Sequence, residues 1–284
     1  MYLNMSKIIS CKGNMKQILN SCLKINQSVK FTSLKTLFFS HKFLKHNFFK
    51  QAIFTQNCIL CASHFNNNSS TISSNNFTPN HYAMCHACMV NLPWQNANHC
   101  PQCGLASDGN LCGSCINSTP HFDATHAVFS YEFPVDKMMQ RYKYGNMLSL
   151  STLFGHLLND KIKQENIDLI IPMPMHPQRL KMRGFNQALE IARFLNTSQH
   201  NKLNYKSVIR QTLTPPQASL PLKARIKNIK GAFRVNIDLT GKKIAIVDDV
   251  MTTGASLNEL AKTLKKAGAT HVECWVVART MPHN

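Results

Sequence analysis

The sequence predicts an α/β domain with a mainly parallel sheet flanked by helices, preceded by a small cysteine-rich domain. Two observations carry this prediction. From about residue 122 onward, apolar runs typical of strands alternate with segments of helical periodicity. Before that point, eight of the eleven cysteines lie in four C-x-x-C pairs. We therefore divide the chain into three parts, residues 1–57, 58–120 and 121–284.

Residues 1–57 are predicted to form a poorly ordered basic extension, because Lys, Asn, Ser and Phe alternate there without a sustained period. The segment has no long apolar core followed by a small-residue cleavage site, so it does not resemble a secretory signal. No run in the chain reaches the roughly 18 apolar residues that a membrane span needs. We therefore expect a cytoplasmic protein without a transmembrane segment.

Basic residues exceed acidic residues along the whole chain. The formal net charge is +19, and nine lysines precede the first acidic residue, Asp108. A basic surface favours polyanions such as phosphates or nucleic acid. A coding bias towards Lys and Asn would produce the same excess, so net charge indicates a class of partner and not a particular site.

The four C-x-x-C pairs predict metal sites. A C-x-x-C turn brings two thiolates to one metal ion and lets backbone N–H groups bond their sulfurs, so two such pairs complete a tetrahedral zinc site. A disulfide framework is the alternative, but the chain shows no export signal and cytosolic thiols stay reduced. The predicted ligands, for one or two zinc ions, are Cys58, Cys61, Cys85, Cys88, Cys100, Cys103, Cys112 and Cys115.

The sequence leaves open which C-x-x-C pairs share a metal ion. Sequential pairing gives one site from the first two pairs and another from the last two, whereas interleaved pairing would join them differently. His64, His81, His86 and His99 lie nearby and could replace a thiolate, but eight cysteines suffice, so we expect these histidines to face solvent. Cys274 lies in an apolar run and is expected to be a buried core thiol.

The order of strands and helices follows from the periodicity of the segments after residue 122. The predicted strands are residues 124–133, 167–174, 242–249 and 270–280, and the predicted helices are residues 135–145, 186–196 and 256–268, the last with Gly268 as its C-cap. The apolar faces of these helices consist of Val135, Met138, Met139, Tyr142, Ala188, Ile191, Leu195, Leu257, Leu260, Ala261 and Leu264. In a parallel sheet of this kind, ligands bind beyond the carboxyl ends of the strands.

Two adjacent acids, Asp248 and Asp249, end the strand 242–249 and precede the turn MTTGAS. The N-terminus of the following helix carries free N–H groups and a partial positive charge, so a phosphate fits there. Two carboxylates would repel a phosphate, so we expect them to accept hydrogen bonds from a diol such as a ribose or to hold Mg²⁺ in its outer shell. The combination predicts a sugar phosphate, held by Thr252, Thr253, Gly254 and Ser256.

The stretch IAIVDDVMTTGAS resembles the phosphoribosyl-pyrophosphate (PRPP) loop of type I phosphoribosyltransferases. The order of motifs along the chain is similar to that of the ComF family of competence-associated proteins: four C-x-x-C pairs, IPMPMHPQRLKMRGFNQA, RQTLTPPQASLPLKARIKNIKGAFRV and the PRPP loop. The resemblance covers roughly residues 58–280. It implies a type I phosphoribosyltransferase-like domain at residues 121–284 and a double zinc ribbon at residues 58–120.

The resemblance also implies roles for individual residues. Asp248 and Asp249 would meet the ribose hydroxyls, and Arg179 and Arg183 would face the anion, so these four form the implied catalytic set. IPMPMH takes the place of the pyrophosphate loop, and Ser256 stands where Thr is common, a change that keeps the hydroxyl. The polar candidates of the family's mobile segment are Gln217, Arg225 and Asn228. The implied binding set is Val247, Asp248, Asp249, Val250, Thr252, Thr253, Gly254, Ala255, Ser256 and Asn186.

Arginine is the residue type best suited to the anion-facing role, because its planar fork grips phosphate oxygens bidentately. Arg179 and Arg183 are the candidates, although arginines near a helix are also ordinary solvated charges; Lys181 is expected to be solvated. Transfer from PRPP would need no protein nucleophile, since Mg²⁺ and arginines stabilise the departing pyrophosphate.

Three functions remain open at this stage. The resemblance favours a ComF-type factor for DNA uptake or utilisation that binds PRPP or a related sugar phosphate and single-stranded DNA. The alternatives are an active phosphoribosyltransferase in nucleotide salvage and a zinc-ribbon scaffold for other competence proteins, such as a ComF-associated helicase. Aromatic side chains that would stack on bases, if exposed, are Trp94, Phe122, Tyr131, Tyr142 and Tyr144.

Overall fold

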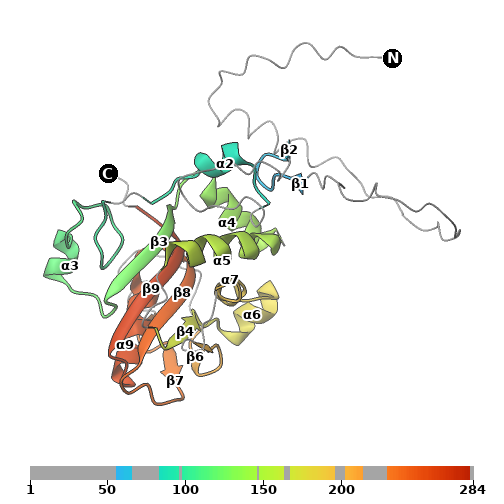
Figure 1. The fold of residues 1–284 in the computed structure, drawn as a ribbon. Helices are drawn as coiled ribbons and strands as arrows, with labels where there is room; N and C mark the ends of the chain where they lie inside the picture. The colour runs from blue at the N-terminus through green and yellow to red at the C-terminus, as the bar shows by residue number, and fades with distance from the viewer. Residues whose placement is uncertain are drawn as a thin grey trace, which may run out of the picture. The chain divides into compact units, whose positions relative to one another are not determined.

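The structure, a computed structural model, describes residues 56–65, 83–95, 98–145, 147–162, 167–195, 202–213 and 229–281 (Figure 1). Contacts within the chain divide it into two units, residues 1–91 and 92–284. The part of the predicted extension up to residue 55 lies outside the described residues, as do Gln217, Arg225 and Asn228. No helix in the described ranges is long and apolar enough to cross a membrane.

The described residues of the first unit, 56–65 and 83–91, form very short elements. Strand β1 (Gln56–Asn57) pairs antiparallel with β2 (His64–Phe65), and helix α2 (His86–Val90) begins after Cys85. Between the strands the chain turns tightly, with the N–H of Ala62 donating to the carbonyl of Cys58 at 2.8 Å. Elements of two and five residues bury little apolar surface, so we expect these described segments to depend on cross-links or metal ligands.

The second unit holds the α/β domain. Its elements are α3 (Gly113–Asn117), β3 (Ala124–Ser130), α4 (Val135–Tyr144), α5 (Ser149–Lys161), β4 (Leu169–Pro172), α6 (Pro177–Arg183), α7 (Gln187–Ala192), β5 (Lys202–Leu203), β6 (Val208–Arg210), β7 (Phe233–Val235), β8 (Lys243–Met251), α9 (Ala255–Lys266) and β9 (His271–Arg279).

Five strands form one sheet in the order β3-β9-β8-β4-β5, and every neighbouring pair is parallel. Helices α5 and α7 pack against strands of this sheet, as does α9. Because β4 to β5 and β8 to β9 step across the sheet in opposite directions, right-handed crossovers place α7 and α9 on opposite faces. The predicted parallel sheet flanked by helices is confirmed.

The core lies where these helices cover the two long central strands. Residues 244–247 of β8 and 274–278 of β9 are fully buried, as expected for parallel strands covered on both faces. The predicted apolar faces of the three helices are buried as well, and so is Cys274, the predicted core thiol. Gly268, predicted as the C-cap of α9, follows the cap residue Ala267 with φ of +102°. A Cβ there would lie 2.8 Å from the backbone of Thr240.

The structure differs from the prediction at several elements. Strand β8 continues through the two aspartates to Met251, because its backbone stays paired with β9 as far as Arg279. Helix α7 ends at Ala192, four residues short of the predicted end at residue 196. Helices α5 and α6 and the antiparallel pair of β6 and β7 were not predicted.

Candidate functional site

The acid pair lies at the point where the strand order of the sheet reverses. Strand β4 is followed outward by β5, whereas its other neighbour, β8, is followed by β9 in the opposite direction. Pro172 at the end of β4 pairs with Val247, so residue 173 and the loop after it run beside Asp248. In open α/β sheets, ligands bind in the crevice at this switch point. The predicted pyrophosphate-loop motif and the acid pair are therefore neighbours across the two strands.

Asp249 is buried and forms an ion pair with Lys143, which was not predicted as a site residue. Its side chain is 5% exposed, and its Oδ2 lies 3.0 Å from the Nζ of Lys143, which is near the end of α4. Oδ2 accepts no other hydrogen bond from the described residues, so the ammonium group of Lys143 is what compensates its buried negative charge. Burial alone would lower the pKa of Lys143, but the carboxylate of Asp249 raises it, and the net shift is upward. Lys143 therefore stays charged.

Asp248 lies in a different environment from its neighbour. Burial, followed by repulsion from Asp249, raises the pKa of Asp248 to about 7, although Lys143 and Arg210 act in the opposite direction. Each aspartate accepts a hydrogen bond on its Oδ1 from the next backbone N–H, at 2.9 Å for Asp248 and 2.7 Å for Asp249. Near neutral pH, Asp248 can therefore donate as well as accept a hydrogen bond, whereas the charge of Asp249 is balanced by Lys143.

Arg210 lies near the acid pair, and Arg179 lies near Arg210. Burial and the nearby charge of Arg179 lower the pKa of Arg210, while Asp248 raises it, so Arg210 lies within electrostatic reach of both residues. Arg210 ends β6, and its guanidinium lies 5.6 Å from the ring centre of Phe233. Arg179 is one of the two predicted anion-facing residues, on α6. Arg210 begins the motif RQTLTPP but was not predicted as a site residue, because the antiparallel pair of β6 and β7 that carries it was not predicted.

The second predicted arginine contacts a tyrosine. The Nη2 of Arg183 donates to the hydroxyl of Tyr144 at 3.3 Å, and its guanidinium lies 5.1 Å from the centre of that ring. Tyr144 follows Lys143 in α4, so Arg183 packs against the segment that balances the acid pair. Lys181, expected to be solvated, is exposed.

Asn186, predicted to bind the ligand, forms hydrogen bonds within the protein. Its Oδ1 caps α7 by accepting from the N–H groups of Ala188 and Leu189, at 3.0 and 3.4 Å. Its Nδ2 donates to the carbonyl of Met173 at 3.1 Å. These bonds fix the start of α7 to the residue after β4, so Asn186 positions the loop of the predicted pyrophosphate motif.

The turn between β8 and α9 has the features of an anion loop. Thr252 and Thr253 are exposed, and Gly254 has φ of +77°, a conformation that favours glycine. A Cβ at Gly254 would lie 2.7 Å from the Cε of Met251. Gly254 is also the N-cap of α9 and has no side chain to cap it, while the hydroxyl of Thr253 accepts a hydrogen bond from the N–H of Ala255 at 3.3 Å. The N–H groups there and the helix dipole suit a phosphate.

The other predicted binding residues are less accessible. Val247 is fully buried in the sheet, and its carbonyl accepts a hydrogen bond from the N–H of Met173 at 2.8 Å. Val250, Ala255 and Ser256 are half-buried around the turn. Val247 thus supports the site through its backbone and offers no side chain to a ligand.

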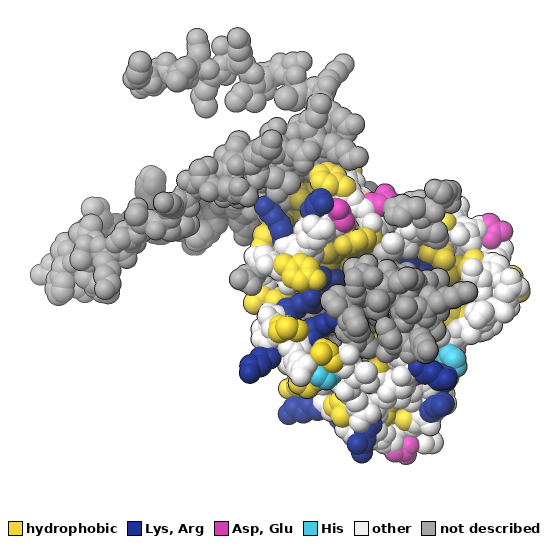
Figure 2. Space-filling model, turned by 180° about the vertical axis from the view of Figure 1, so that it is seen from behind, with side chains coloured by type: hydrophobic (Ala, Val, Ile, Leu, Met, Phe, Trp, Pro, Cys, Tyr) yellow, Lys and Arg dark blue, Asp and Glu magenta, His cyan; other side chains and the backbone are white. Residues whose placement is uncertain are grey.

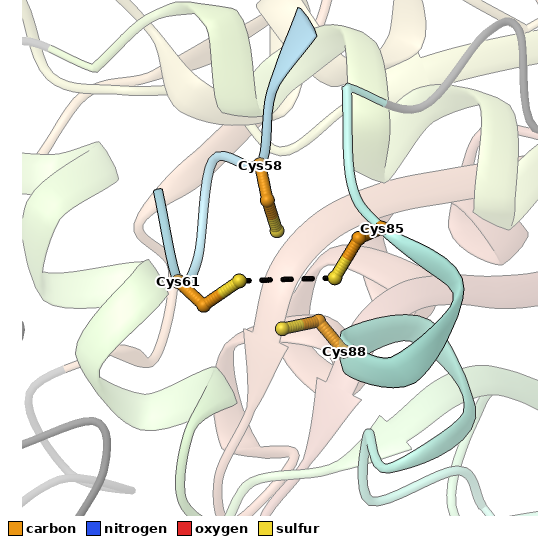
Figure 3. Close-up of side chains that lie close together, drawn as sticks. All are labelled: Cys58, Cys61, Cys85 and Cys88. Atoms are coloured by element: carbon orange, nitrogen blue, oxygen red, sulfur yellow. Dashed lines mark hydrogen bonds between the residues drawn. The ribbon is translucent and has the colours of Figure 1, made fainter. Parts of the chain in front are cut away.

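The first cysteine cluster brings together Cys58, Cys61, Cys85 and Cys88, whose side chains converge in Figure 3. Their four Sγ atoms lie within 4.8 Å of one another, and Cys61 and Cys85 are 3.7 Å apart. Two sulfurs in a tetrahedral zinc site with bonds of about 2.3 Å lie about 3.8 Å apart. The arrangement fits a tetrahedral metal ion.

The second cysteine cluster lies in the same unit as the sheet and has the same geometry. Cys100, Cys103, Cys112 and Cys115 also place their Sγ atoms within 4.8 Å of one another, with 3.5 Å between those of Cys103 and Cys112. The two clusters follow the sequential pairing, the first of the two alternatives. His64 and His86 are exposed, as expected, His99 is half-buried, and His81 lies outside the described residues.

The thiols of both clusters compete for protons. Hydrogen bonding from Cys88 lowers the pKa of Cys58, whereas the same contact together with burial raises the pKa of Cys88. In the second cluster, burial raises the pKa of Cys103 to about 11. Four thiols cannot all ionise at such distances unless a cation balances the charge of the thiolates. The donor set and the geometry therefore both fit a bound metal ion in each cluster.

The aromatic residues considered for base stacking differ in exposure. Phe122 and Tyr142 are buried in the core, at 2% and 0% exposed, and cannot stack on a base without unfolding. Trp94 and Tyr131 are half-buried. Tyr144 is 74% exposed and is the one of the five that offers an open ring. Figure 2 shows Lys and Arg side chains spread over the face in view, with fewer acidic ones between them.

Comparison with known proteins agrees with the fold of the α/β domain. Residues 183–282 match the phosphoribosyl transferase domain family, which confirms the predicted type I phosphoribosyltransferase-like fold class. DNA utilization protein YhgH of Escherichia coli O6:H1 is 30% identical over 71% of this chain and 92% of its own. Competence protein F of Haemophilus influenzae is 30% identical over 69% and 90%, and competence protein ComFC of Streptococcus pneumoniae 25% identical over 69% and 87%.

Proposed function

The chain belongs to the ComF family, which includes DNA utilization protein YhgH and competence proteins F and ComFC, and from this premise we propose that it acts in DNA uptake or utilisation by binding PRPP or a related sugar phosphate. The observation that carries the ligand is the acid pair beside the turn from residue 252 to 256, at the strand-order reversal. A phosphate would lie at the N-terminus of α9, and the ribose hydroxyls would contact Asp248 and Asp249.

The two aspartates would form different hydrogen bonds with the ribose hydroxyls. Asp249, held by Lys143 at 3.0 Å, can only accept hydrogen bonds, while Asp248 can also donate when protonated. Arg210 and Arg179 supply positive charge on the side of β6 and α6, where a pyrophosphate group would be stabilised. When bound with PRPP, Mg²⁺ would balance phosphate charge, with the aspartates within reach of its outer shell.

Thermal stability with added ligand tests this site. Wild-type protein should gain stability with PRPP and Mg²⁺, and a smaller amount with ribose 5-phosphate, because a ligand that binds the native state alone stabilises it. Asp248→Asn should abolish the gain without unfolding the protein, since its carboxyl is already partly protonated near neutral pH. Asp108→Asn combined with Glu132→Gln changes exposed acids and is the matched control. A gain that survives in Asp248→Asn would contradict the proposed role of the acid pair.

The same site could serve an active phosphoribosyltransferase in nucleotide salvage. Transfer would need the arginines near the acid pair to stabilise a departing pyrophosphate, and Arg210 and Arg179 meet that requirement of charge. Release of pyrophosphate from PRPP in the presence of candidate bases, lost in an Arg210→Met variant, would support catalysis. Binding of PRPP without turnover for any base would favour a role in recognition alone.

We also propose that the protein binds single-stranded DNA and holds one zinc ion in each cysteine cluster, in the cytoplasm, where thiols stay reduced. The net charge of +19 and the exposed ring of Tyr144 beside Arg183 support a nucleic-acid contact. Binding to a short oligonucleotide should weaken steeply with salt, and an affinity independent of salt would contradict phosphate contacts.

If neither PRPP nor the oligonucleotide binds, the zinc-bearing chain would be a scaffold for other competence proteins, such as a helicase.

A further inference from the structure

Arg279, the last residue of β9, is a buried cation without a carboxylate partner. It is 3% exposed, and it forms no salt bridge within the described parts of the chain. A buried charge is costly unless hydrogen bonds and an opposite charge compensate it. Its surroundings must therefore supply both.

The hydrogen bonds of Arg279 reach two different parts of the second unit. Its Nε donates to the carbonyl of Cys103 at 2.8 Å. Its Nη1 donates to the carbonyl of Met251 at 3.0 Å and also to that of Thr252. Cys103 belongs to the second cysteine cluster, and Thr252 begins the turn proposed to hold the phosphate. One rigid guanidinium thus joins the cluster to the turn.

The cysteine loop is packed closely against this arginine. A Cβ at Gly104 would lie 3.3 Å from the side chains of both Gln95 and Thr125, and 3.7 Å from the Cγ of Arg279. The Oγ1 of Thr125 donates to the carbonyl of Gln102 at 2.6 Å. The loop that carries Cys100 and Cys103 therefore has little room to shift without moving the arginine.

The cluster also provides the missing negative charge. Four thiolates around a divalent cation carry a net charge of about −2, and this charge lies next to the guanidinium through Cys103. The metal-loaded cluster can therefore balance Arg279, as a carboxylate would elsewhere. The guanidinium in turn reduces the cost of burying the thiolates.

We propose that Arg279 is a positioning residue that makes the shape of the turn from Thr252 to Ser256 depend on the metal-loaded second cysteine cluster. The cluster fixes the guanidinium by charge and through the carbonyl of Cys103. The guanidinium fixes the carbonyls of Met251 and Thr252, and so directs the following N–H groups towards the ligand. This inference rests on the proposed function for its ligand-binding consequence, but not for the coupling between cluster and turn.

Two variants separate the charge of Arg279 from its hydrogen-bond geometry. Arg279→Lys keeps the charge, but a single ammonium group cannot reach the carbonyl of Cys103 and those of Met251 and Thr252 at once. Metal content should therefore remain that of wild type. PRPP affinity should fall about tenfold, the equivalent of one or two net hydrogen bonds. Arg279→Met removes both, so metal retention during dialysis against a chelator should fall as well. Arg234→Lys, on an exposed strand position, is the matched control.

Hydrogen exchange without ligand tests the coupling directly. Amides of residues 252–257 should exchange faster in Arg279→Lys than in wild type at equal metal content, and faster in wild type after the metal is removed. If exchange of this turn is unchanged in both cases, the coupling is wrong whether or not PRPP binds. If exchange responds as expected but wild type binds no PRPP, the coupling stands and the proposed ligand is wrong. Equal exchange in Arg279→Lys and Arg234→Lys would also overturn the inference.

Discussion

The two cysteine clusters have the same four ligands and nearly the same geometry, but they are built into the chain differently. The first joins the segments 58–61 and 85–88, and its described neighbours are strands of two residues and a helix of five. The second closes a shorter loop and is tied by Thr125, Gln102 and Arg279 to the central sheet. The difference indicates that one metal ion would organise a small unit, whereas the other would support a binding site.

Removing metal should have its largest effect on the first unit. Zinc in a small domain supplies about 10 kcal/mol or more of apparent binding free energy, and elements of two to five residues cannot replace it. After chelation, amides in residues 56–65 and 83–91 should lose protection from exchange, while those of β8 and β9 keep theirs. Metal analysis should find about two ions per chain before treatment. Protection that persists in the metal-free first unit would remove the distinction between the clusters.

A large effect confined to the second unit is expected from Lys143→Met. Removing one partner of a buried ion pair leaves an uncompensated charge on Asp249 and should cost about 3 kcal/mol of unfolding free energy. Lys137→Met, on the same helix but with an exposed side chain, should cost less than about 1 kcal/mol. Denaturant unfolding measures both.

A double variant checks whether the ion pair causes that loss. Lys143→Met combined with Asp249→Asn removes both charges, so it should recover most of the lost stability. If the double variant is no more stable than Lys143→Met alone, the loss comes from packing of the lysine stem.

Asp248 should give the unfolding free energy of the second unit a pH dependence of its own. The pKa of Asp248 is raised to about 7 in the folded state from the ordinary value of 3.8, so the native state binds more protons than the unfolded state between these values. Stability from this group is therefore full below about pH 4 and is lost as pH rises through about 7. Asp248→Asn should flatten this decline in unfolding experiments from pH 5 to 8, and an unchanged profile would show that Asp248 is not the group responsible.

The smallest expected effect concerns the attachment of the second cluster. Thr125→Val keeps the shape of a buried side chain but removes the 2.6 Å bond to the carbonyl of Gln102. The loss should be about 1 kcal/mol of unfolding free energy for the second unit. Chelator resistance of the second cluster should fall with it, while that of the first stays at the wild-type value. Equal changes at both clusters would mean that Thr125 acts on global stability alone.

Periodicity and motif spacing were sufficient for much of the fold and part of the site. The predicted strands and helices from residue 124 to 280 are present, because their apolar positions recur at the spacing that buries one face or one strand. Helix α5 was missed although it carries such a signal, since Leu150, Leu153, Phe154, Leu157 and Leu158 recur at helical spacing and are buried. The other segments that were not predicted lack it. Strands β6 and β7 have three residues each, and α6 has no buried residue to reveal its period.

The same contrast holds for the site residues: those in the local motif were predicted, and several from other elements were not. The motif around the acid pair predicted the turn from Thr252 to Ser256, and the structure places it at the start of α9. Lys143, Arg210 and Arg279 were missed, because each reaches the site from an element far away in sequence. Asn186 was selected as a ligand residue, and the structure shows both of its polar atoms bonded within the protein.

The sequence by itself determined the alternation of strands and helices, the four C-x-x-C pairs and the acidic turn, because each depends on local spacing. The tertiary structure decided which cysteine pairs meet, which aspartate is balanced by Lys143, and which cation joins the second cluster to the turn. These features depend on contacts between residues up to 176 positions apart. Such contacts exist only after the sheet has formed, since the strand order brings the distant segments together.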